Sequence, residues 1–111
     1  MAYGAGDMVD SSTSLTVAAS TPEPYVHLDN RGLVISNGPR CVMVPASSFR
    51  FAAETFALIA DERRATRHQH DHILGGYADG GDVVLFGGLR DDLVSVRLPR
   101  AAFDELRRAL A

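Results

Sequence analysis

The segment Asp82–Ala111 has a strand period that gives way to a helical period. A short apolar run, VVLF, leads through a Gly-Gly turn to Leu93–Leu98, where apolar and polar residues alternate as in a strand with one buried face. Pro99 suits the first turn of a helix, because its missing N–H costs nothing there. Beyond the proline, apolar residues recur at helical spacing. The segment therefore predicts a hairpin followed by an amphipathic helix that packs on it.

A looser copy of this pattern occurs earlier in the chain. Leu33–Phe49 parallels Val83–Phe103, with Pro45 aligned to Pro99, and each stretch predicts strand, turn, strand, proline and helix. A further strand is expected before each copy. The predicted fold class is α+β, a tandem β-β-β-α repeat in which one antiparallel sheet carries two helices on one face. The alternative is chance similarity, since proline is common where a strand leads into a helix.

The composition of the N-terminal residues differs from that of the rest. Residues 1–24 are rich in Ser, Thr, Ala and Gly and predict a flexible tail, in which Ser14–Ala18 can pair as an edge strand. Residues 25–111 are expected to form a single α+β domain of two units, about 25–68 and 69–111. Gly75–Asp82 predicts a flexible loop inside the second unit.

The first predicted helix runs from Pro45 to about Thr66. Its apolar arc is wide, because Phe51 and Leu58 lie off the main stripe. The helix is therefore either deeply buried or provides a second apolar face for a partner or a homodimer.

The charge and composition exclude several classes of function. All 11 basic residues are Arg, so chemistry that needs a Lys is excluded, and the net charge of −3 argues against strong non-specific nucleic-acid binding. No apolar run approaches the length of a membrane span, and no secretory signal is visible. With a single cysteine, the chain has no internal disulfide, and a cytoplasmic location without a membrane partner is expected. No cofactor is expected.

The pattern of a strand that ends in Leu-Pro before a helix resembles the single-stranded nucleic-acid-binding families of the PUR, PC4 and whirly type. The residues that carry the resemblance are Val94–Leu98, Pro99, Phe103, Leu106 and Leu110, with a looser copy in Val42–Pro45 and Phe49. The resemblance implies basic and aromatic residues on an open sheet face that binds nucleic acid or a partner. The residues expected to fill that role are Tyr25, His27, Arg40, Arg90, Ser95 and Arg97.

Three histidines, His68, His70 and His72, recur at every second position. In an extended segment this spacing places all three imidazoles on one side, where they can bind Zn²⁺ or Ni²⁺. The alternative is a solvated polar segment near the end of a helix.

No Ser-His-Asp arrangement, carboxylate pair or phosphate-binding loop is visible, so the chain is not expected to be an enzyme. The sequence favours a small intracellular binding or regulatory module, homodimeric, that acts by protein–protein contact. One alternative is a single-stranded nucleic-acid-binding or transcription-associated protein that uses the open sheet face. Another is a metal-binding protein that uses the three histidines.

Overall fold

A computed structural model describes residues 14–18 and 24–110 of the chain. In the described part, the order β-β-β-β-α occurs twice, with a 3-10 turn, η2, before the first helix. The first unit comprises β1 (Ser14–Ala18), β2 (Tyr25–Asp29), β3 (Gly32–Asn37), β4 (Arg40–Pro45), η2 (Ala46–Ser48) and α1 (Phe49–Glu62). The second unit comprises β5 (Arg64–Gln69), β6 (His72–Asp79), β7 (Asp82–Leu89), β8 (Asp92–Pro99) and α2 (Arg100–Leu110).

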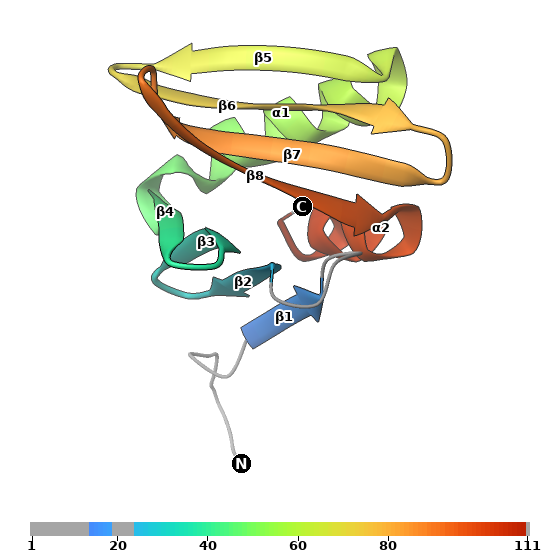
Figure 1. Cartoon of the computed structure of the whole chain (residues 1–111), viewed down its shortest axis with the longest axis horizontal. Helices are drawn as coiled ribbons and strands as arrows, with labels where there is room; N and C mark the ends of the chain where they lie inside the picture. Colours follow the sequence, from blue (N-terminus) through green and yellow to red (C-terminus); the bar gives the residue numbers. More distant parts are fainter. Residues whose placement is uncertain (1–13, 19–23, 111) are drawn as a thin grey trace.

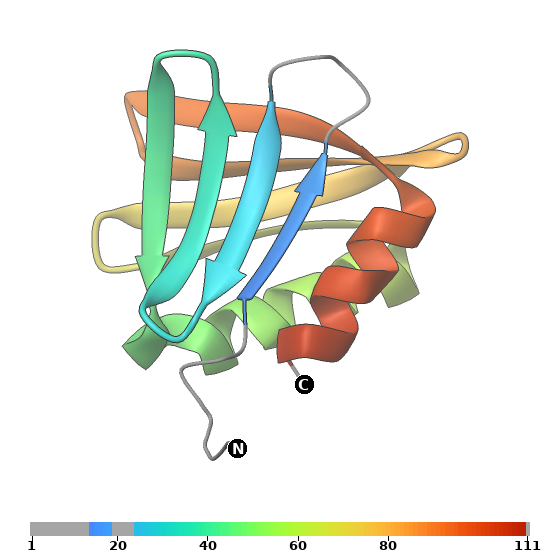
Figure 2. The same cartoon turned by 90° about the horizontal axis from the view of Figure 1, so that it is seen from below.

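The strands form two antiparallel four-stranded sheets, β1–β4 and β5–β8, in which every strand pairs with its neighbour in sequence. Figure 2 shows the strands of one sheet crossing those of the other at a steep angle, with the two helices along one side of the space between the sheets. The predicted α+β class with antiparallel pairing is confirmed, and both helices contact the inner face of β5–β8. Each unit, however, has four strands instead of three and forms a sheet of its own.

Side chains at the β3–β4 turn link the first sheet to β8 of the second sheet. The amide of Asn37 donates to the carbonyl oxygen of Ser95 at 2.8 Å, and the guanidinium of Arg40 donates to the carbonyl oxygen of Leu93 at 2.9 Å and pairs with Asp92. These bonds satisfy acceptors of β8 that another strand would otherwise use. The first sheet therefore meets the second through side chains and not through a backbone ladder.

The two units share a feature at the proline that precedes each helix. The N–H of Ala46, after Pro45, donates to the carbonyl of Arg31 at 3.0 Å, and the N–H of Arg100, after Pro99, donates to that of Gly81 at 3.0 Å. Arg31 and Gly81 each lie in the turn between the second and third strands of their unit. In both units, one hydrogen bond thus joins the start of the helix to the same hairpin turn.

The core lies between the two sheets and the helices. The rings of Phe56 in α1 and Phe103 in α2 are both fully buried, and their centroids are 5.5 Å apart. The sheets contribute mainly branched apolar side chains to this core. The buried ones are Val17, Val26, Leu28, Leu33, Ile35, Leu74, Val83, Leu85, Val94, Val96 and Leu98.

The first helix is shorter than its apolar pattern predicts. It ends at Glu62, and Arg63 adopts a left-handed conformation with φ of 68°, so the prediction of a helix to about Thr66 is wrong. The reason is tertiary: β5 begins at Arg64 and pairs along its whole length with β6. The junction between the units lies at Arg63, earlier than the expected boundary near residue 68. Among the described residues, no helix has the length and apolar character needed to cross a membrane.

The predicted loop Gly75–Asp82 is mostly strand, because β6 continues to Asp79. Gly75 and Gly76 are required by close packing. A Cβ on Gly76 would lie 2.5 Å from the carbonyl oxygen of Val84 and 3.0 Å from Ile59 of α1. Only Gly80 and Gly81 form the turn itself, and Gly80 has φ of +62°.

The predicted tail contains β1, which pairs with β2 as an edge strand and places Val17 in the core. The edge strand that the sequence allowed at Ser14–Ala18 is thus present, and the prediction of a flexible tail is wrong for these residues, because pairing with β2 holds them. The rest of the predicted tail that precedes Pro24 lies outside the described residues.

Candidate functional site

The helix-free side of the sheet β5–β8, which we call the outer face, carries three rows of side chains that run across all four strands. Both helices contact the opposite side, and Figure 1 shows α1 behind this sheet. Because paired residues in an antiparallel ladder point to the same side, the register assigns each row directly. The rows are Arg64–Tyr77–Val84–Arg97, Thr66–Gly75–Phe86–Ser95 and His68–Ile73–Gly88–Leu93.

The middle row places an aromatic ring on the outer face. Phe86 in β7 is paired with Gly75 in β6, and a Cβ on Gly75 would lie 2.7 Å from Cζ of that ring and 2.9 Å from Cε1. The ring of Phe86 therefore lies over Gly75, in space that a side chain would fill. It is half-buried and keeps part of its surface open to a ligand.

The first row places a second ring beside a cation. The guanidinium of Arg64 lies over the ring of Tyr77, with 5.6 Å from Cζ to the ring centroid. Arg64 is exposed, and within residues 14–18 and 24–110 no carboxylate forms an ion pair with it. Its charge is therefore available to an anion, while Tyr77 and Arg97 border an open hollow of about 450 Å³.

Arg97 is held differently from Arg64. Its guanidinium donates to Asp79 at 2.7 Å and to Asp82 at 3.4 Å. These hydrogen bonds, first to Asp79 and then to Asp82, raise the pKa of Arg97 above its ordinary value. The two carboxylates also neutralise this end of the row, so Arg97 orders the edge of the face and Arg64 supplies its free positive charge.

The structure separates the site residues that the sequence grouped together. Ser95 and Arg97 lie on the outer face as expected. Tyr25 and His27 lie on the outward side of the other sheet, because each unit has its own sheet. The remaining two candidates are also apart: Arg40 contacts β8 at the junction of the sheets, and Arg90 lies in the exposed turn between β7 and β8.

Sequence reasoning missed Tyr77 and Phe86, which complete the outer face. Their alternation was hidden by the glycines that neighbour them in β6 and β7. The signal that was available is the two-residue spacing of Gly75 and Tyr77 within one strand, which places both on the same side.

The three histidines do not converge. His70 and Asp71 form the two-residue turn between β5 and β6, and His70 has φ of 57°. His68 is paired with Ile73 on the outer face, whereas His72 is paired with Gln69 on the opposite side. In the described ranges, no group of three His, Cys, Asp or Glu side chains is placed to hold a metal ion. The predicted metal site is therefore wrong, because a tight turn replaces the extended segment that it assumed.

The residues expected to form a partner face on the first helix are partly engaged within their own chain. Phe51 is half-buried, packs against the core and lies under Arg67, whose guanidinium carbon is 5.3 Å from the ring centroid. Leu58 is half-buried on α1.

A network on the outward side of β1–β4 fixes His27. Its Nδ1 is bonded to the hydroxyl of Thr16, and its Nε2 is 3.1 Å from Oδ2 of Asp29. The other carboxylate oxygen of Asp29 accepts the N–H groups of Arg31 at 2.8 Å and Gly32 at 3.3 Å. The N–H of Arg31 is the main cause that lowers the pKa of Asp29 below its ordinary value, and partial burial opposes it.

This network predicts that the stability of the folded protein falls in acid. The pKa of Asp29 is lower in the folded protein than the 3.8 of the unfolded chain, so its stabilising effect is complete above pH 3.8 and is lost as the pH falls through the folded value. Asp29→Asn should therefore lower the urea midpoint at neutral pH, and the difference from the wild type should shrink below pH 3.8. Chemical unfolding followed by circular dichroism at a series of pH values measures this. A difference that stays constant at all pH values would contradict the assignment.

Comparisons with known proteins give a fold and no family. No family model matches the chain, and no curated protein matches it. A solved structure titled "Crystal structures of trypanosoma bruciei MRP1/MRP2" is similar, with a TM-score of 0.52 and 15% sequence identity over 87% of this chain and 80% of that one. At this identity, the likeness shows that the two chains share an α+β fold.

Proposed function

We propose that this protein binds single-stranded nucleic acid on the outer face of β5–β8. The observation that carries the proposal is the placement of Tyr77 and Phe86, two half-buried rings in adjacent rows, on a face that neither α1 nor α2 covers. Beside them lies Arg64, which forms no ion pair within the described part of the chain. Adjacent rows are two residues apart along a strand, which corresponds to about 6.8 Å. Two neighbouring rings on an open sheet provide a stacking platform for successive bases.

The chemistry of the rows favours unpaired bases over a duplex. Every base has a π-face, so it can stack on Phe86 or Tyr77 whatever its identity. Arg64 can contact a phosphate, and the hydroxyls of Thr66 and Ser95 can contact phosphate or sugar. A sheet without a projecting helix or strand ribbon has nothing to insert into the major groove of a duplex.

The charge balance of the chain determines how strongly nucleic-acid binding should depend on salt. The chain has a net charge of −3, and Asp79 and Asp82 neutralise Arg97. Few phosphates are therefore neutralised, and binding should depend on salt less steeply than in a strongly basic protein. The resemblance of Val94–Leu110 to PUR, PC4 and whirly-type sequences supports the proposal, since in those families an open sheet face binds single strands.

Fluorescence anisotropy with labelled oligonucleotides tests the proposal. Phe86→Ala should weaken single-strand binding by roughly tenfold, because each stacked base contributes about 1–3 kcal/mol. Arg64→Gln should weaken binding and lower the salt slope by about 0.7, the value for one phosphate contact with a single strand. Matched controls are Phe51→Ala and Arg50→Gln on α1, the helix that packs on the opposite side of the sheet, and both should bind as the wild type does.

Two results would count against the proposal: equal affinity for single and double strands, or variants at Phe86 and Arg64 that bind like the wild type. Light scattering on the same sample gives the oligomeric state. If no oligonucleotide binds and the protein is a dimer that Phe86→Ala dissociates, the outer face is a protein–protein contact, as the sequence alone favoured.

A further inference from the structure

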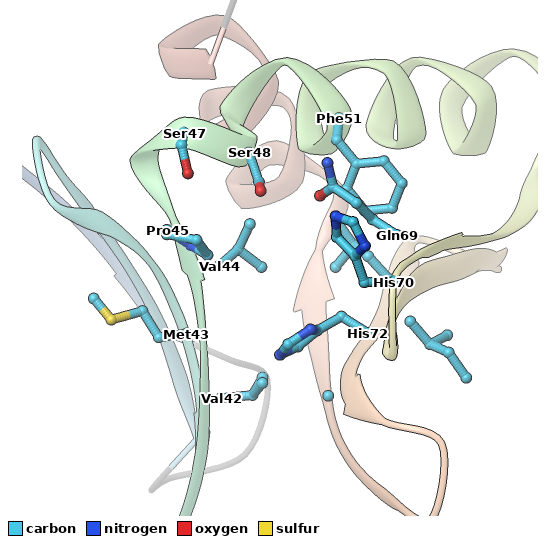
Figure 3. Close-up of a pocket in the computed structure, with 13 residues that line it drawn as sticks. Val42, Met43, Val44, Pro45, Ser47, Ser48, Phe51, Gln69, His70 and His72 are labelled. Atoms are coloured by element: carbon cyan, nitrogen blue, oxygen red, sulfur yellow. The ribbon is translucent and has the colours of Figure 1, made fainter.

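A cavity of about 340 Å³ lies between the edge strand β4, the start of α1 and the hairpin of β5 and β6. We call it the β4–α1 cavity. Figure 3 shows Val42 and Val44 on one wall, Phe51 above, and His72 projecting from the hairpin toward β4. The side chains of His72 and its partner Gln69 point away from the outer face. The lining includes Ile73 and Gly88 of the third outer row, but none of Arg64, Tyr77 and Phe86, the residues that carry the proposed nucleic-acid surface.

The walls of the cavity are apolar, and its rim carries polar side chains that can donate hydrogen bonds. The apolar lining includes Val42, Val44, Phe51 and Leu74. The polar side chains at the rim are Ser47, Ser48, Gln69, His70 and His72. Each of these five can donate a hydrogen bond from a hydroxyl, amide or imidazole. Among the described residues, none of the five has a side-chain hydrogen-bond partner, and no Asp or Glu lines the cavity.

We propose that the β4–α1 cavity binds a small molecule with a planar apolar body and an anionic head, of the aromatic carboxylate or sulfonate class. The body lies between Val44 and Phe51, where its burial removes apolar surface from water. The head lies at the rim and accepts hydrogen bonds from His70, His72 and Gln69. The volume falls within the range of natural ligand pockets, which combine apolar walls with a few polar groups that fix orientation.

The charge of the head follows from what the rim contains and what it lacks. Donors bonded to an ionised acceptor form stronger hydrogen bonds than donors bonded to a neutral one. An anion at this rim meets no carboxylate of the lining, whereas a cation would find no carboxylate there to neutralise it. The rim therefore selects the anion from two ligands that have the same apolar body.

Two fluorescent probes that share one apolar ring system separate the contributions of the apolar walls and the polar rim to binding. Anilinonaphthalene sulfonate carries an anionic head, and phenylnaphthylamine has the same ring system without it. Titration of the full chain should give one site for the sulfonate, with an affinity at least about tenfold higher than that of the neutral probe.

Three variants assign the site. Val42→Phe fills the cavity from an edge strand and should abolish binding of both probes. His72→Leu keeps the apolar volume but removes a donor, so it should weaken the sulfonate by about tenfold and leave the neutral probe unchanged. Phe86→Ala alters the outer face and should change neither probe. Circular dichroism checks that each variant is folded.

The proposal is overturned if the wild type binds both probes equally, or if His72→Leu weakens both by the same factor. Loss of sulfonate binding in Phe86→Ala would place the probe on the outer face instead. If Val42→Phe does not fold, the ratio of sulfonate affinity to neutral-probe affinity in His72→Leu still tests the proposal. None of these results depends on whether the protein binds an oligonucleotide.

Discussion

Replacing Phe103 with Ala is expected to lower the free energy of unfolding by about 3–5 kcal/mol. The ring is fully buried and packs against the ring of Phe56 at a centroid distance of 5.5 Å. It is also the largest side chain that α2 places in the core, and the pair joins the helices of the two units. Domains of this size are stable by only about 5–15 kcal/mol, so this single truncation removes a large part of the total.

Guanidinium chloride unfolding followed by far-ultraviolet circular dichroism measures the effect as a shift of the midpoint. Phe103→Leu, which keeps most of the volume, should cost much less than Phe103→Ala. Phe86→Ala is the matched control, because the same truncation on the outer face leaves no enclosed cavity. Equal midpoints for Phe103→Ala and Phe86→Ala would show that the contact between the helices does not hold the units together.

Replacing Gly75 with Ala is expected to damage both stability and binding. The added Cβ would lie 2.4 Å from the carbonyl oxygen of Ala65 and 2.7 Å from Cζ of Phe86, so either β5 or the ring must move. Overpacking of this kind typically costs about 1–3 kcal/mol. Displacement of the ring should also weaken single-strand binding about as much as Phe86→Ala does.

Gly81→Ala is the matched control for this substitution. Gly81 lies in the exposed turn between β6 and β7, where an added Cβ meets nothing within 4 Å. It should therefore leave the unfolding midpoint and oligonucleotide affinity near their wild-type values. If Gly75→Ala binds as well as the wild type, the position of the Phe86 ring does not matter for binding, and the stacking platform is wrong.

Elements whose apolar residues follow a regular strand or helix period could be predicted from the sequence. Elements whose conformation depends on long-range packing could not. The alternation in β8 and the helical stripe of α2 are local patterns, and both elements occur as predicted. The glycines of β6 are ambiguous in isolation, because glycine marks a turn in one context and a close approach of backbones in another. Only the position of Ile59 against Gly76 shows which of these applies.

The sequence predicts only the part of the candidate site that depends on a local pattern. Ser95 and Arg97 follow from the alternation of one strand, and they lie on the outer face. Tyr77 and Phe86 join them only through the register of three strands, which depends on where β6 ends and β7 begins. The prediction for Tyr25 assumed that both units share one sheet. Whether they do depends on long-range packing, which a local pattern does not reveal.

The pairing of every strand with its neighbour in sequence has a consequence for how the chain folds. All six ladders close short loops, and such local contacts lose little chain entropy when they form. Topologies dominated by local contacts fold fast. The hairpins of each half can therefore form independently, and the slower event is the meeting of the β3–β4 turn with β8. In the folded protein, the hydrogen bonds of Asn37 and Arg40 hold this contact. They join residues that are 58 and 53 positions apart in the sequence.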